Sequence, residues 1–200
     1  METKYAVNSV SRSLMNIQDE IADVEKNAIC LVDQHGVEKI LDELAEKITK
    51  QCAKENPVIL CVMTGAVVVV GKLLPKLNFP LEMDYIHATR YQGATIGGEL
   101  VWKQHPTVEL KNRTVIIIDD ILDEGITMQY LTQFCKDQGA DKTYSVVLVD
   151  KNITTEKAIQ ADFVGITLED YYLFGLGMDY KGYLRNANGI FACPKDGENK

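Results

Sequence analysis

Residues 115–125 read VIIIDDILDEG, in which four residues that favour β-strands lead directly into acidic residues. Asp119 and Asp120 are adjacent, and Asp123 and Glu124 follow after two aliphatic residues. Like charges at this spacing repel one another unless a cation, or a ligand rich in hydroxyl groups and bound metal, lies among them. The stretch therefore predicts a buried strand that leads into a ligand-binding site.

Apolar runs and helical stretches alternate through the middle of the chain. The expected strands are residues 58–63, 114–118 and 145–149, and the expected helices are residues 37–52, a stretch that ends near Leu77, and about Thr127 to Gln138. Short, continuously apolar strands separated by helices are typical of parallel strands buried on both faces. The sequence therefore predicts an α/β fold with a central, mainly parallel sheet flanked by helices.

Residues 80–104 depart from this alternation. The run LEMDYIHATRY (81–91) resembles a strand, and the next segment, QGATIGGELVW (92–102), carries three glycines before another strand-like run. Ligands of parallel α/β sheets bind beyond the carboxyl ends of the strands. A long hairpin beside such a site is a usual form of lid. We expect Arg90 and Tyr91 to lie on this lid.

The length of the chain, 200 residues, fits one domain. Residues 1–30 and the segment after about 165 do not follow the alternation of strands and helices. We therefore expect a single domain over residues 1–200. Its core is expected at about 30–165, and a small cap, or hood, is expected from about 1–30 and 166–200.

Charge and composition argue against several classes of function. The net charge of −8 and the pI near 4.9 disfavour a nucleic-acid surface. No apolar run approaches the roughly 18 residues of a membrane span, and the amino-terminal residues lack the order of a signal peptide. The five cysteines form no CxxC pair, which favours reduced thiols in the cytoplasm. The three histidines are scattered, without the spacing of metal ligands.

The loop from Asp123 to Thr127 has the features of a phosphate site. A tight loop with Gly125 directs backbone N–H groups inward, and the following helix offers its positive amino terminus. Upstream of this loop, Asp119 and Asp120 offer acceptors that suit neighbouring sugar hydroxyls. A ribose that carries a 5-phosphate satisfies both halves. No GxxxxGK[ST] motif occurs, and GLGMDY (175–180) lacks the third glycine of a dinucleotide-binding motif.

The stretch VIIIDDILDEGIT (115–127) resembles the phosphoribosyl-diphosphate (PRPP) signature of the type I phosphoribosyltransferase family. Three further stretches narrow the resemblance to the hypoxanthine-guanine branch: VLVDK (147–151), ADFVGITLEDYYLFGLGMDY (161–180) and YLR (183–185). The resemblance covers about residues 30–193. It implies purine salvage, in which the 5-phosphoribosyl group of PRPP is transferred to N9 of hypoxanthine or guanine. The products are IMP or GMP and diphosphate.

The resemblance also implies a role for each matching residue. Ribose and 5-phosphate binding is implied for Asp119, Asp120, Asp123, Glu124, Gly125, Ile126 and Thr127. Asp123 is also the implied general base, near N7 of the purine. Diphosphate binding is implied for Thr64, Gly65 and Arg185, and purine binding for Lys151, Tyr172, Leu173 and Asp179. The implied cofactor is Mg²⁺, held by Asp119, Asp120 and Asp179 together with PRPP.

Three positions depart from the pattern of the family. Glu124 stands where threonine is common, and we expect its side chain to face outward with only its backbone in the phosphate cradle. Thr64 stands where lysine is common, so a lysine contact to diphosphate is not carried over. The family has a non-proline cis peptide at this loop. Leu176 stands where an aromatic residue is frequent.

Two alternatives remain open at this stage. One is a regulatory protein of the same fold that senses PRPP without catalysis, which the acidic charge and the lack of a basic extension disfavour. The other is a phosphoribosyltransferase for another base, such as adenine, orotate or xanthine. Lys151 and Tyr172 favour a 6-oxopurine but do not exclude xanthine. The family resemblance implies a homodimer or homotetramer, while the charge and the short apolar runs predict no nucleic-acid or membrane partner.

Overall fold

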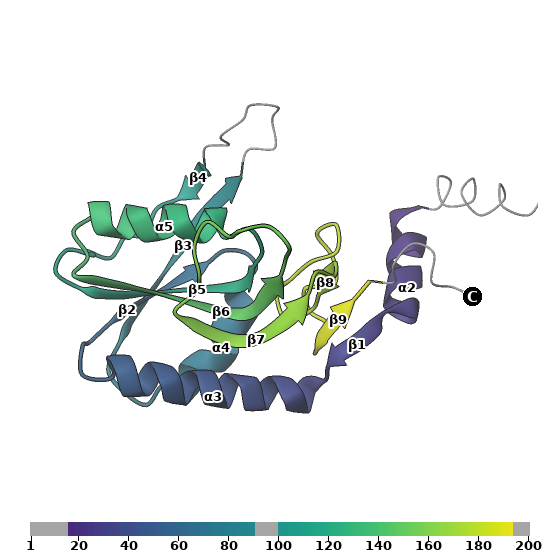
Figure 1. The fold of residues 1–200 in the computed structure, drawn as a ribbon, viewed down its shortest axis with the longest axis horizontal. Helices are drawn as coiled ribbons and strands as arrows, with labels where there is room; N and C mark the ends of the chain where they lie inside the picture. The colour runs from purple at the N-terminus through teal and green to yellow at the C-terminus, as the bar shows by residue number, and fades with distance from the viewer. Residues whose placement is uncertain (1–15, 91–99, 194–200) are drawn as a thin grey trace, which may run out of the picture.

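The computed structural model describes residues 16–90 and 100–193, and its centre is a six-stranded sheet (Figure 1). The strand order is β4-β3-β2-β5-β6-β7, and every neighbouring pair is parallel except β3 and β4. The strands are β2 (Val58–Val62), β3 (Glu82–Arg90), β4 (Leu100–Gln104), β5 (Thr114–Leu122), β6 (Lys142–Asn152) and β7 (Phe163–Glu169). The predicted mainly parallel sheet is confirmed.

Helices cover both faces of this sheet. Helix α3 (Gln34–Cys52), α4 (Val67–Leu73) and the short 3₁₀ helix η1 (Leu74–Lys76) lie on one face, and α5 (Ile126–Asp137) lies on the other (Figure 1). Asp33 caps α3, since its side chain accepts a hydrogen bond from the Gly36 N–H at 2.8 Å. The α/β class and the three predicted helices are confirmed. Within the described residues, no helix is long and apolar enough to cross a membrane.

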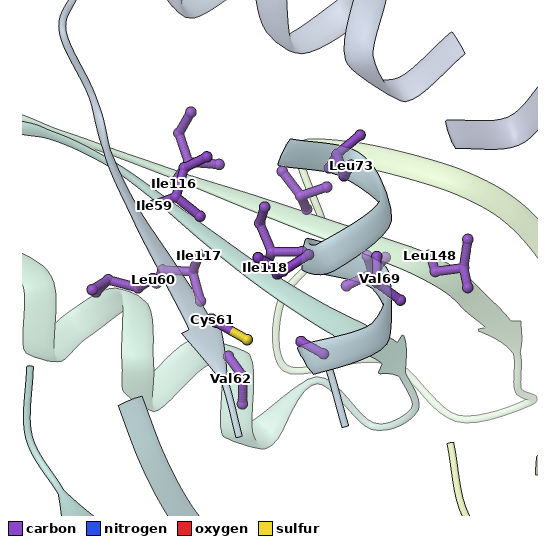
Figure 2. Packing of buried hydrophobic residues seen from close by; sticks show 14 of the residues in the cluster. Ile59, Leu60, Cys61, Val62, Val69, Leu73, Ile116, Ile117, Ile118 and Leu148 are labelled. Atoms are coloured by element: carbon purple, nitrogen blue, oxygen red, sulfur yellow. The ribbon is translucent and has the colours of Figure 1, made fainter. Parts of the chain in front are cut away.

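The core lies where the central strands meet the helices. Residues 58–62 of β2, 115–118 of β5 and 146–149 of β6 are all buried. Figure 2 shows side chains of these strands packed with Val69 and Leu73 of α4. Burial on both faces explains why these strands are continuously apolar rather than alternating. The packed centre gives the acidic end of β5 a rigid base.

Strand β5 is longer than its apolar run predicts. The ladder with β6 continues through Asp119, Ile121 and Leu122, which pair with Val147, Val149 and Asp150. The expected end of the strand near Ile118 is therefore wrong, because the backbone goes on pairing after the side chains become acidic. As a result the acidic pair lies within the sheet rather than in a loop beyond it.

A second, smaller sheet lies at one end of the main sheet (Figure 1). It has the order β1-β9-β8, with antiparallel neighbours, and is built from β1 (Ile29–Val32), β8 (Leu173–Phe174) and β9 (Ile190–Ala192). Helix α2 (Ile17–Asn27) lies beside it. We call this sheet, α2 and residues 175–189 the hood. The boundary expected near residue 165 falls inside β7, which remains in the main sheet to Glu169.

The described part of the expected hairpin pairs as predicted. Strands β3 and β4 are antiparallel, with Thr89 opposite Val101 and Arg90 opposite Leu100. Arg90 is the last residue of β3, and Tyr91 lies outside the described residues. The hairpin is therefore confirmed, and its function as a lid stays a prediction.

Candidate active site

Two adjoining cavities open at the carboxyl ends of β5 and β6. The larger, of about 330 Å³, is lined by Gly65, Asp120, Ile121, Asp123, Lys151, Tyr171, Tyr172, Leu173, Met178, Asp179 and Arg185. The smaller, of about 220 Å³, is lined by residues 119–128. Both include Asp120, Ile121 and Asp123. The two cavities therefore form one cleft in two parts, with the acidic residues at the junction.

The smaller cavity is an anion cradle. We call residues 123–127 the phosphate loop. Gly125 has the left-handed φ of +77° and precedes α5, whose first-turn N–H groups have no acceptor within the helix. The first turn of α5 contains no acidic residue. The Glu124 side chain is exposed, as predicted, while its carbonyl accepts a hydrogen bond from the Ala158 N–H at 2.9 Å. Free amides at a helix amino terminus suit a phosphate group.

Asp119 and Asp120 carry an electrostatic cost in the ligand-free protein. Burial, and next the charge of Asp120, raise the pKa of Asp119 well above its ordinary value. Burial also raises the pKa of Asp120, although Asp119 and the Arg185 guanidinium act in the opposite direction. Two adjacent carboxyl groups that resist ionisation favour a cation or hydroxyl donors among them.

The larger cavity has a wall made of backbone. The Met63–Thr64 peptide bond is cis, as the family resemblance implied, and Gly65 follows it. A Cβ atom on Gly65 would lie 2.2 Å from Oδ2 of Asp120, and one on Gly177 would lie 1.8 Å from the Gly65 carbonyl oxygen. Only glycine allows the hood and the main sheet to approach this closely. The Thr64 side chain itself is exposed.

Asp179 and Arg185 form an ion pair at the rim of the larger cavity. Arg185 Nη2 lies 2.6 Å from Asp179 Oδ1, and Arg185 Nη1 donates to the Gly177 carbonyl at 2.5 Å. The other carboxylate oxygen of Asp179 accepts from the Gly182 N–H at 2.6 Å. Both side chains are held in place before any ligand arrives. Arg185 therefore presents a fixed positive charge to the cavity.

Lys151, which lines the same cavity, lies between two acids. Its Nζ is 2.5 Å from Asp170 Oδ1 and 3.4 Å from Asp123 Oδ2. Burial lowers the pKa of Lys151, but the hydrogen bond to Asp170 and the charge of Asp123 outweigh it, and the pKa lies above its ordinary value. Lys151 is therefore a charged donor, with its side chain only 11% exposed.

Tyr172 provides an open aromatic face beside Lys151. It is 55% exposed, and its ring meets the edge of the Tyr180 ring at 5.4 Å between centroids. The Tyr180 hydroxyl donates to Glu20 of α2 at 2.7 Å. Leu173, the next residue along the chain, is buried in β8. The cavity therefore offers a flat ring and a cation to a planar ligand.

Comparisons with known proteins agree with this geometry. The family model described as phosphoribosyl transferase domain matches residues 30–181. The chain belongs to the phosphoribosyltransferase family. A hypoxanthine-guanine-xanthine phosphoribosyltransferase of Tritrichomonas foetus is 32% identical over 78% of this chain and 86% of its own length. A hypoxanthine-guanine phosphoribosyltransferase of Bacillus subtilis is 30% identical over 82% of this chain and 90% of its own.

A solved phosphoribosyltransferase structure has the same fold. It bears the name hypoxanthine-guanine-xanthine phosphoribosyltransferase and superimposes with a TM-score of 0.74 at 28% identity. The superposition covers 84% of this chain and 95% of that chain. The similarity therefore extends over most of both chains.

The cleft brings together most of the residues that the sequence singled out. The loop residues line the smaller cavity, and Gly65, Arg185 and the four purine-side residues line the larger one. Asp170 was missed, although it pairs with Lys151. The only signal was its place beside another acid, Glu169, and two adjacent acids ordinarily indicate a solvated turn. Glu20 was missed as well, since its partner Tyr180 lies far along the chain.

The acidic pair of this phosphoribosyltransferase, with Asp120 buried and Asp119 half-buried, predicts a trade between stability and ligand binding. A carboxyl group whose pKa is raised on folding makes the folded state bind more protons, so stability falls as the pH rises above the ordinary value of 3.8. We expect Asp119→Asn to stabilise the metal-free protein at pH 7 by about 1 kcal/mol or more, since each unit of pKa shift is worth about that much.

The measurement is urea unfolding in EDTA at several pH values. The gain from Asp119→Asn is expected to shrink as the pH falls toward 3.8 and to disappear below it, where the carboxyl group of the parent is protonated in both states. Asp141→Asn, at an exposed position, serves as the control with no comparable gain. A variant less stable than the parent at pH 7 would contradict the prediction.

Proposed function

We propose that this phosphoribosyltransferase transfers the 5-phosphoribosyl group of PRPP to N9 of hypoxanthine or guanine, forming IMP or GMP and diphosphate in purine salvage. The observation that carries the proposal is the cleft in two parts. The smaller cavity holds the anion cradle, and the larger cavity holds a cation beside an open aromatic ring. Asp120 and Asp123 line both cavities. The names of the related proteins support the same reaction.

The purine would bind in the larger cavity, against Tyr172. Its ring stacks on the exposed face of Tyr172, and Leu173 and Asp179 line the same wall. Lys151 donates to the 6-oxo group, because an ammonium group has donors and no acceptor. Asp123 lies 3.4 Å from the Lys151 ammonium, a separation that suits neighbouring atoms on one edge of the purine.

In this proposal Asp123 is the general base. It shares the proton at purine N7 while N9 attacks the anomeric carbon, where the transition state resembles an oxocarbenium ion. Asp119 and Asp120 bind the ribose hydroxyls, and the amides of the phosphate loop bind the 5-phosphate. The β3–β4 hairpin, with Arg90 and Tyr91, acts as the lid that excludes water.

The leaving diphosphate would meet the backbone wall and a fixed cation. The N–H groups of Thr64 and Gly65 offer donors, and Arg185 supplies the positive charge that Asp179 and the Gly177 carbonyl hold in place. A backbone donor needs no side chain at position 64. Threonine can therefore replace the lysine common in the family, and the wall keeps its shape.

The residues fit Mg²⁺ as the cofactor. Among the described residues no group of three or more potential ligands could form a metal cage. Mg²⁺ is typically held by one or two carboxylates plus substrate oxygens and waters. Asp119, Asp120 and Asp179 are the carboxylates that line the cleft and suit this arrangement. When bound, the ion shields the charge of the diphosphate.

Two further parts of the proposal concern specificity and assembly. Xanthine fits the site as a third base, because it keeps the 6-oxo group and a relative from Tritrichomonas foetus is named for it. A homodimer or homotetramer, a cytoplasmic location and a single domain for the whole chain complete the proposal. The five free cysteines suit a reducing compartment.

A product assay tests this function directly. The full chain, PRPP and Mg²⁺ are incubated with hypoxanthine, guanine, xanthine or adenine, and nucleotides are separated by chromatography. We expect IMP and GMP, very little AMP, and no turnover in excess chelator, since the diphosphate cannot leave with its charge unshielded. Binding of PRPP without any nucleotide product would favour the regulatory alternative.

Replacement of Asp123 tests the general base. Asp123→Asn keeps the shape and hydrogen-bonding capacity of the side chain, and we expect kcat to fall roughly 10²–10⁴-fold with little change in PRPP affinity. Single-turnover kinetics measure the chemical step. Asp137→Asn, at the exposed end of α5, is the control. An unchanged chemical rate would assign proton transfer to another group.

Replacement of Lys151 tests the choice of base. Lys151→Gln offers an amide that can donate or accept, so we expect it to weaken hypoxanthine use by roughly 1–3 kcal/mol. The gap between hypoxanthine and adenine should narrow, because the required donor is gone. The measurement is kcat/KM for each base. Lys142→Gln, at the other end of β6, is the matched control. Equal discrimination by parent and Lys151→Gln would remove Lys151 from the purine site.

A further inference from the structure

The phosphoribosyltransferase has a support behind the phosphate loop that lies outside the cleft described above. We call residues 157–159 the buttress segment. Lys157 Nζ donates to the Leu122 carbonyl at 3.2 Å, and the Ala158 N–H donates to the Glu124 carbonyl at 2.9 Å. The Ala158 carbonyl in turn accepts from Gln129 Nε2 of α5 at 3.1 Å. The segment therefore contacts the chain before the loop, in it and after it.

The fit behind the loop is close as well as hydrogen-bonded. A Cβ atom on Gly125 would lie 3.0 Å from the Ile159 carbonyl oxygen and 3.2 Å from the Ile159 nitrogen. The backbone of the buttress segment therefore fills the space on the outer side of Gly125. A loop packed in this way has one position, and the direction of its amide groups is fixed with it.

Lys157 joins this support to the main sheet. Its ammonium group pairs with the Asp150 carboxylate as well as with the Leu122 carbonyl, and its side chain is 14% exposed. Leu122 and Asp150 are register partners on β5 and β6. One ammonium group thus connects the last residue of β5 to the neighbouring strand. The phosphate loop leaves the sheet at the very next residue.

We propose that Lys157 is a positioning residue for PRPP: it fixes the end of β5 so that the loop amides meet the 5-phosphate. The inference rests on the proposed function and adds a residue to it. Lys157 acts through the Leu122 carbonyl and the phosphate loop. Displacement of a binding group by about 1 Å can reduce a rate by 10²-fold, so a small relaxation of the loop is enough to be measured.

The experiment compares three variants of the full chain. Lys157→Met removes the ammonium group and leaves Asp150 without it. The double variant Lys157→Met with Asp150→Leu removes both charges, a replacement that often preserves stability, but it does not restore the donor to Leu122. Lys157→Arg keeps the charge and the donors. Lys142→Met, which breaks the ion pair with Glu55 at the other end of β6, is the matched control.

We expect Lys157→Met and the double variant to raise the KM for PRPP roughly 10-fold, with kcat and the KM for hypoxanthine within about twofold of the parent. Lys157→Arg should recover most of the affinity, and the control should resemble the parent. Calorimetry with ribose 5-phosphate should show the same loss, while binding of diphosphate stays unchanged. Thermal unfolding should show that the double variant regains stability without regaining affinity.

Two outcomes would overturn the inference. One is an unchanged KM for PRPP in Lys157→Met, and the other is recovery of both stability and KM in the double variant, which would make the ion pair purely structural. A parent protein that forms no IMP would instead contradict the proposed function. In that case the ribose 5-phosphate titrations would still decide the role of Lys157, because they do not depend on turnover.

Discussion

The burial of two adjacent carboxyl groups, Asp119 and Asp120, at the end of β5 is the constraint on which the rest of the site depends. The two carboxyl groups belong to a strand whose preceding residues are buried, so they cannot escape into solvent without breaking the ladder with β6. The pKa values of both carboxyl groups are raised because ionising them in this position costs free energy. The packed sheet below them holds the pair in place, and the energy not recovered within the protein is available to a ligand that brings metal and hydroxyl groups.

The cleft is formed by the main sheet and the hood together. The sheet supplies the acids, the phosphate loop and Lys151, the connection before β8 supplies Tyr172, and the hood supplies the pair formed by Asp179 and Arg185. The two parts meet where the backbones approach without side chains between them. Binding energy from the phosphate end of the donor can therefore help to orient the reacting carbon at the other end, since both ends contact one rigid body.

Much of this arrangement could be predicted from local sequence, because apolar runs and helical spacing depend on neighbours in the chain. Strands β2 to β6, the three helices and the phosphate loop belong to this class, whereas β7 and the three strands of the hood were not predicted. The continuation of β5 could not be predicted, since ladder pairing with β6 overrides the unfavourable side chains. Asp170 and Lys157 were also beyond reach, because their partners Lys151, Leu122 and Asp150 become neighbours only after the sheet forms.

The two ends of the cleft differ in whether backbone or side chains make the contacts, and this difference affects how such a protein can evolve. In the proposed function the phosphate groups of the donor meet mainly backbone N–H groups beside close glycines, where an added side chain obstructs the fold. In the same proposal the purine meets the side chains of Lys151 and Tyr172, which line the larger cavity and which single substitutions can exchange. Mutation can therefore explore new acceptor bases while the phosphoribosyl donor stays fixed.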